Sequence, residues 1–115
     1  MAQPHTESSQ VIRIAPLGAQ LAGASTTAIL KARQLEVVRV VLPAGKTLAQ
    51  HRVPGEITLQ CIEGAVQLRT EGAVQELRAG DFVHLQGGAH HELLGLEAAS
   101  LLLTICLGAG AGSGC

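Results

Sequence analysis

Two histidines stand in glycine-framed segments of this chain. His51 follows Gly45 by six positions, and His91 follows Gly80 by eleven. Imidazole exchanges protons near neutral pH more readily than any other unperturbed side chain, and it is also the commonest metal ligand in proteins. The two segments are therefore the candidates for a binding, catalytic or metal site.

The first segment resembles the first motif of the cupin family, G-x5-H-x-H-x3/4-E-x6-G. Gly45, His51 and Gly64 match this pattern, and Val53 stands where the second histidine belongs. The resemblance extends over residues 35–107, about two-thirds of the chain.

The second segment is similar to the second cupin motif, G-x5-P-x-G-x2-H-x3-N. Gly80, Gly88 and His91 match, whereas Gln86 replaces the proline and Gly95 replaces the asparagine. The glycine spacing across both motifs makes the resemblance moderately specific for the fold.

The resemblance implies an all-β, single-domain cupin, an antiparallel jelly-roll β-barrel of about nine to eleven strands. The barrel is expected over residues 11–107, between disordered tails at 1–10 and 108–115. It also implies a homodimer, as in many small cupins. Val11–Ala15 would pair across the interface and bury an exposed edge.

The complete cupin motif binds iron, manganese or another divalent ion through three histidines and a carboxylate. The resemblance leaves His51 and His91 as metal ligands here, with Glu56 and Gln60 as candidate oxygen donors. The metal would be Fe, Mn, Ni or Zn. His90, at a place usually taken by proline, is expected to point outward.

The strand register after His51 has two alternatives. Counting back from Gly64 puts Ile57 in the glutamate slot, so that Ile57 faces the lumen and Gln60 faces away. A bulge at Pro54-Gly55 would put Glu56 in the slot instead and turn Gln60 inward. A slip of one residue exchanges all the side chains that face the lumen with those that face away from it.

Segments of strand length alternate with glycine-containing turns along the chain. Leu17–Ala22 predicts one short helical turn. Short β-branched or alternating runs predict strands, and about nine of them in series favour an antiparallel two-sheet or closed fold. The predicted strands are Val11–Ala15, Thr27–Ala32, Leu35–Leu42, Ile57–Ile62, Ala65–Arg69, Ala73–Leu77, Asp81–Leu85, His91–Leu96 and Ser100–Leu107.

Composition restricts the possible functions. The content of 47% hydrophobic and 15% charged residues in 115 is that of a globular domain. Phe82 is the only aromatic residue and the net charge is −1, so stacking on bases and phosphate neutralisation are both disfavoured. We expect no nucleic-acid partner, no membrane span and a cytoplasmic location. The cysteine spacing predicts no disulfide framework; two thiols are expected to be buried and Cys115 to lie in the tail.

Three hypotheses for function follow. The first is a module that binds a small-molecule ligand in the barrel lumen without catalysis, which the missing histidine at Val53 and the aliphatic lumen favour. The second is a metal-dependent enzyme of dioxygenase or isomerase type, with His51 and His91 in a reduced metal site. The third is a structural or interaction role for an empty barrel.

Overall fold

The structure is a computed structural model that describes residues 6–51 and 53–108, with residues 49–51 described by their backbone alone. Within these ranges one 3₁₀ helix precedes nine strands. No helix in the described ranges is long and apolar enough to cross a membrane. The elements are η1 (Gly18–Gly23), β1 (Thr27–Lys31), β2 (Leu35–Leu42), β3 (Thr47–His51), β4 (Ile57–Glu63), β5 (Ala65–Thr70), β6 (Ala73–Arg78), β7 (Phe82–Leu85), β8 (His91–Gly95) and β9 (Ala99–Cys106).

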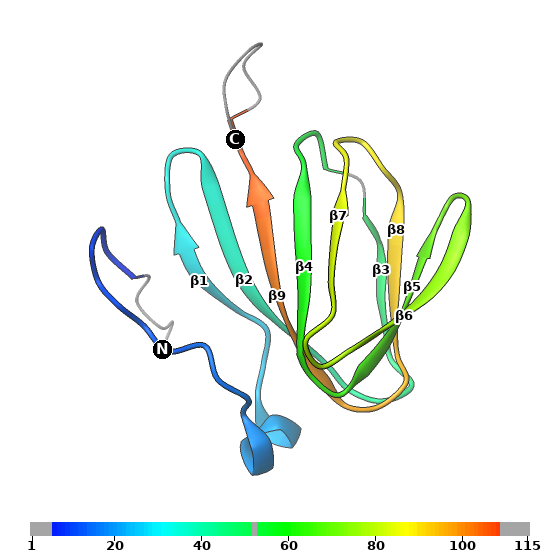
Figure 1. The fold of residues 1–115 in the computed structure, drawn as a ribbon. Helices are drawn as coiled ribbons and strands as arrows, with labels where there is room; N and C mark the ends of the chain where they lie inside the picture. Colours follow the sequence, from blue (N-terminus) through cyan, green and yellow to red (C-terminus); the bar gives the residue numbers. More distant parts are fainter. Residues whose placement is uncertain (1–5, 52, 109–115) are drawn as a thin grey trace.

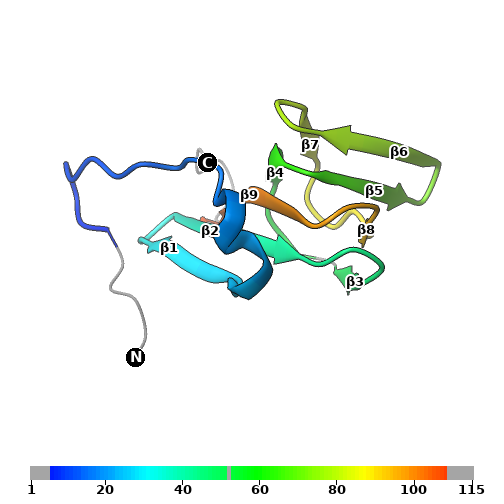
Figure 2. The same cartoon turned by 90° about the horizontal axis from the view of Figure 1, so that it is seen from below.

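The strands form two antiparallel sheets that lie against each other (Figure 1, Figure 2). The five-stranded sheet has the order β1-β2-β9-β4-β7, and the four-stranded sheet has the order β3-β8-β5-β6. The all-β prediction is confirmed, and nine strands fall within the expected number. Eight of the nine coincide with predicted segments to within one residue at each end.

The core between the sheets is aliphatic. Leu59 and Leu101 enter it from the five-stranded sheet, and Leu68 and Leu93 from the four-stranded sheet. Each of these side chains is at most 1% exposed. Burial of one such side chain stabilises a fold by about 1.5–3 kcal/mol, so these leucines hold the two layers together.

The pattern of burial along β4 settles its register. Ile57, Leu59 and Cys61 are buried, whereas Gln60 between them is exposed. Ile57 therefore occupies the glutamate slot and faces the core. The alternative register, with Glu56 in the slot and Gln60 inward, does not form.

A β-bulge at Ile62 interrupts this alternation at the end of β4. Cys61 lies opposite Leu101 and Glu63 lies opposite Ser100. Between these two pairs β4 therefore advances by two residues, whereas β9 advances by only one. A bulge re-aims the side chain that follows it. Glu63 consequently joins Ser100 on the outer face of the five-stranded sheet.

The Glu63 carboxylate fastens η1 to this outer face. It accepts hydrogen bonds from the backbone N–H groups of Leu17 and Gly18, at 2.8 and 3.1 Å, and from the Ser100 hydroxyl. Burial acts to raise the pKa of the Glu63 carboxyl, but these bonds and the nearby positive charge of Arg39 outweigh it and lower the pKa below its ordinary value. The charged form is therefore the one that holds η1.

Two sequence predictions were wrong and one element was missed. Val11–Ala15 forms no strand and runs as an extended segment before η1. Cys106 is disulfide-bonded rather than a free buried thiol, while Cys61 is a buried free thiol as expected. The strand Thr47–His51 was not predicted. Most of the two predicted tails, residues 1–5 and 109–115, lies outside the described residues.

The turn between β4 and β5 depends on Gly64. Its φ is +78°, and a Cβ there would lie 2.0 Å from the carbonyl oxygen of Ala98. We expect Gly64→Ala to lower the free energy of unfolding by about 1–3 kcal/mol, measured by urea denaturation. Gly72→Ala is the matched control, because a Cβ at Gly72 meets nothing within 4 Å. Equal losses in the two variants would contradict this account.

Replacement of Glu63 tests its role as the carboxylate that fastens η1. The pKa of Glu63 is lowered in the folded state, so its ionised carboxylate contributes to the free energy of unfolding. This contribution is fully present above the ordinary pKa of 4.5 and disappears as the pH falls through the lower pKa of the folded state. Glu63→Gln should cost about 1–2 kcal/mol of unfolding free energy at neutral pH, and the difference from wild type should shrink below pH 4.5.

Urea unfolding over a pH series measures that difference. Glu97→Gln is the control, because Glu97 forms only an exposed ion pair with Arg78, and such pairs contribute little. A Glu63→Gln deficit that stayed constant through the range in which glutamate titrates would show that the carboxylate charge is not what holds η1.

Candidate functional site

The pairing of β3 with β8 brings two of the predicted site positions together. His51, the last residue of β3, lies directly opposite His91, the first residue of β8. His91 is only 6% exposed, and its Nδ1 lies 3.5 Å from the carbonyl oxygen of Ala89. On its other side β8 pairs with β5, where His91 lies opposite Thr70. The backbone positions of the two motif histidines therefore lie opposite each other across one pair of strands.

The loop that follows β3 is fixed against the loop that precedes β8. The carbonyl of Val53 accepts a hydrogen bond of 2.8 Å from the N–H of Gly88. A Cβ at Gly87 would lie 2.3 Å from the carbonyl oxygen of Pro54, so only glycine permits this approach. Val53, at the position of the missing motif histidine, thus lies beyond the end of the strand, in a loop contact.

Glu56 binds a histidine that the sequence did not assign to the site. Its Oε1 lies 2.6 Å from Nε2 of His84, and both side chains are more than half exposed. His84 lies opposite Thr58 and alternates with the inward-facing Val83 and Leu85 on β7. The Glu56–His84 pair therefore lies on the outer side of the five-stranded sheet.

Gln60 is also on the outer face. It is exposed and lies opposite Phe82 on β7 and Leu102 on β9. Among the described residues, no group of three or more His, Cys, Asp or Glu side chains could hold a metal ion. The structure thus puts positions 51 and 91 opposite each other and holds Glu56 and Gln60 on the outer side of the five-stranded sheet. The side chain of His51 lies outside the described residues, and the four-ligand set stays a prediction.

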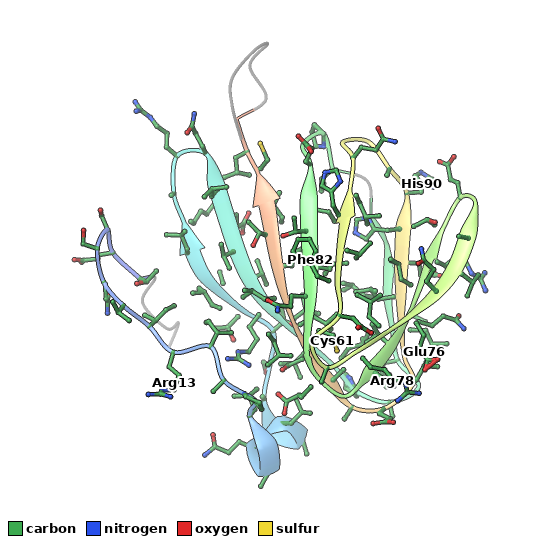
Figure 3. The ribbon with its side chains drawn as sticks, viewed as in Figure 1. Arg13, Cys61, Glu76, Arg78, Phe82 and His90 are labelled. Carbon is green, nitrogen blue, oxygen red and sulfur yellow. The ribbon has the colours of Figure 1, made fainter. Side chains whose placement is uncertain are left out.

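A polar hollow opens at the end of the sheets where β8 begins. Its volume is about 690 Å³, and it lies between the β5–β6 turn and the β7–β8 loop. Figure 3 shows His90 beside the end of β8, next to the β5–β6 hairpin. The hollow is lined by Thr70, Glu71, Gly72, His84, Leu85, Gln86, Gly87, Gly88, Ala89 and His90.

Sequence reasoning missed the two histidines of this hollow. His90 was expected to point outward, yet it lines the hollow, and His84, an exposed residue of β7, lines it as well. Their side chains offer nitrogen donors and acceptors, and the carboxylate of Glu56 holds His84 at Nε2. The one local signal was the glycine pair Gly87-Gly88 between them, which marks a close backbone approach.

The interior below this hollow offers no comparable polar surface. The inward residues of β4, β5, β8 and β9 are nearly all apolar and buried, and no buried side-chain nitrogen or oxygen in the described ranges lacks a hydrogen-bond partner. The polar surface therefore lies at this end of the sheets, which we call the mouth, and not between them.

Comparison with known proteins identifies the fold. No protein-family model matches the sequence, and a search of curated proteins finds no match. Among solved structures, a cupin superfamily protein from Desulfitobacterium hafniense superposes with a TM-score of 0.73 at 11% identity, over 92% of this chain and 97% of that one. A conserved protein of unknown function from Streptococcus pyogenes superposes with a TM-score of 0.70 at 16% identity, over 92% and 94%.

An enzyme is also similar in fold. A deletion mutant of oxalate decarboxylase from Bacillus subtilis superposes with a TM-score of 0.60 at 20% identity, over 63% of this chain and 21% of that chain. The two-layer antiparallel architecture and these superpositions indicate the same fold. The chain has the fold of the small single-domain cupins.

Proposed function

We propose that this protein binds a small polar molecule at the mouth and does not transform it. The observation that carries the proposal is the hollow of about 690 Å³ between the β5–β6 turn and the β7–β8 loop. Its size lies within the range of about 300–1,000 Å³ that small-molecule sites occupy. The aliphatic packing between the sheets leaves this polar hollow as the place for the ligand, rather than the lumen.

The lining residues indicate the class of ligand. Imidazole nitrogens of His84 and His90, the amide of Gln86 and the hydroxyl of Thr70 can donate or accept hydrogen bonds. No Phe, Tyr or Trp is among the described residues that line the hollow, so a base or flavin ring would find no large aromatic side chain to stack on. A hydroxylated acid or sugar of a few carbons suits these groups best.

A metal-dependent enzyme is the second candidate. The observation in its favour is the register of β3 and β8, which puts position 51 opposite position 91. Imidazole ligands suit iron, manganese, nickel and zinc. Against it stand the outward positions of Glu56 and Gln60. The fold itself does not decide, because one fold carries many activities.

The homodimer and the cytoplasmic location stay predictions. Val11–Ala15, the segment expected to pair across a dimer interface, forms no strand in this chain. Pairing with a second copy would require this segment to find a strand partner that its own chain does not give it.

Binding at the mouth is testable with two hydroxylated acids and a sugar as probes. Ligand-observed NMR with gluconate, malate and glucose should detect binding to the wild type. His90→Ala removes one hydrogen-bonding group from the hollow and should weaken binding of the best probe about three- to tenfold. Gln20→Ala, on the exposed η1 helix, is the control and should change nothing. Equal weakening by both variants, or no saturable binding of any probe, would refute the proposal.

Metal content separates the two candidate functions. Elemental analysis of protein purified without chelators and incubated with Fe, Mn, Ni or Zn should find well below one metal per chain if the mouth only binds small molecules. Near-stoichiometric metal that is lost in both His51→Gln and His91→Gln, but retained in His84→Gln, would instead support the enzyme. In that case Val53→His should raise the metal affinity, because it restores the motif.

A further inference from the structure

A second hollow lies on the other side of the molecule, under the N-terminal arm, which we define as residues 6–17. The arm is joined to the rest of the chain near its two ends. At its start the N–H of Thr6 donates a 2.9 Å hydrogen bond to the carbonyl of Ile29 in β1. At its end the Glu63 carboxylate accepts the N–H of Leu17 at 2.8 Å.

Between these two points the arm spans a space. Among the described residues, the hydrogen bonds of residues 7–16 stay within the arm. Figure 2 shows the arm standing away from the sheet. The hollow that it covers has a volume of about 1040 Å³. A segment fixed near both ends and unattached between them forms a roof over this hollow.

The lining of this hollow is amphipathic. Ile12 and Ile14 from the arm and Ile29 from β1 supply aliphatic surface. Ser25 and Thr27 add polar groups, although the Thr27 hydroxyl is engaged with the Ser25 carbonyl at 2.8 Å. Such a surface accommodates a molecule with a hydrocarbon part and one polar end.

Arg39 supplies the charged group of the lining. It lies on β2 opposite Thr27, so it faces the same outer side of the sheet. Its guanidinium forms one hydrogen bond with the described residues, a long one of 3.4 Å from Nη1 to the Ser100 hydroxyl. A guanidinium has five N–H donors, and the nearby Glu63 carboxylate already accepts three hydrogen bonds from other groups. Most donors of Arg39 are therefore open to the hollow.

The balance of charge also favours an anion. Arg13 lines the hollow from the arm as well, and Glu7 is the one carboxylate among the lining residues, so the lining itself carries one positive charge in excess. The charged Glu63 near Arg39 lies outside the lining, and its oxygens are occupied by three other donors. Arg–carboxylate pairs are frequently bidentate and stronger than neutral hydrogen bonds.

We propose that this hollow binds a small organic carboxylate with an aliphatic body. The carboxylate pairs with Arg39, and the hydrocarbon part lies against Ile12, Ile14 and Ile29 beneath the arm. The site is independent of the mouth, because the two hollows share no lining residue.

Isothermal titration calorimetry with octanoate tests the proposal, with octanamide as the neutral probe of equal length. Octanoate should bind the wild type saturably and octanamide about tenfold or more weakly, because it lacks the charge that pairs with Arg39. Arg39→Gln should weaken octanoate binding by a similar factor. Arg33→Gln, an exposed arginine outside the hollow, should leave binding unchanged, and so should His90→Ala at the mouth.

A second variant keeps the test decisive if Arg39→Gln folds poorly. Ile12 is 40% exposed on the arm, so Ile12→Gln leaves the core intact while it removes hydrocarbon from the roof. It should weaken octanoate binding about fivefold or more. The proposal is overturned if octanoate shows no saturable binding to wild type at millimolar concentration, if octanamide binds equally well, or if Arg33→Gln reduces binding as much as Arg39→Gln.

Discussion

The alternation of side chains along β4 is the constraint on which the rest of the structure depends. β4 lies between β9 and β7, so both of its edges are paired, and each side chain must point to one face of the sheet or the other. Because Ile57, Leu59 and Cys61 occupy the core, Gln60 is held outside. Turning it inward would expose the buried row, at about 1.5–3 kcal/mol for each large apolar side chain. Packing energy, and not the chemistry of Gln60, decides where it lies.

The bulge at Ile62 turns Glu63, the last residue of β4, to the outer face of the five-stranded sheet. Without the bulge, regular alternation would direct Glu63 to the same side as Cys61, inward, where an unpaired carboxylate is costly. With it, Glu63 meets Ser100 and the start of η1. The turn that follows can form only because Gly64 adopts a positive φ and tolerates the carbonyl of Ala98 at close range. One bulge and one glycine thus fix where the N-terminal arm ends.

The sequence predicted the elements whose signals are local. Strands such as Leu35–Leu42 carry β-branched runs and end in turn residues, and they formed where expected. Thr47–His51 was missed because its single large apolar residue, Leu48, gives no alternation. The prediction of a strand at Val11–Ala15 was wrong for the opposite reason. Its β-branched residues favour a strand, but a strand also needs a partner edge, and β-propensity contains no information about one.

Motif spacing predicted only part of the candidate site. That spacing identified His51 and His91, which the strand pairing puts opposite each other. It could not reveal that His84 and His90 line one hollow, because the hollow exists only where the β5–β6 turn meets the β7–β8 loop. Nor could it reveal Glu63, whose partner Leu17 lies 46 residues away along the chain.

The two hollows differ in how they are built, and this difference bears on what each can select. Backbone contacts fix the mouth: the N–H of Gly88 binds the carbonyl of Val53, and Gly87 lies against Pro54. The backbone that carries its polar groups is therefore held in place, which favours discrimination by hydrogen-bond geometry. The second hollow has a roof attached only near its ends, so binding there must also order the arm and loses part of its free energy to that ordering. Such a site gains affinity mainly from apolar contact and one charge, and it tolerates variation in the shape of the hydrocarbon.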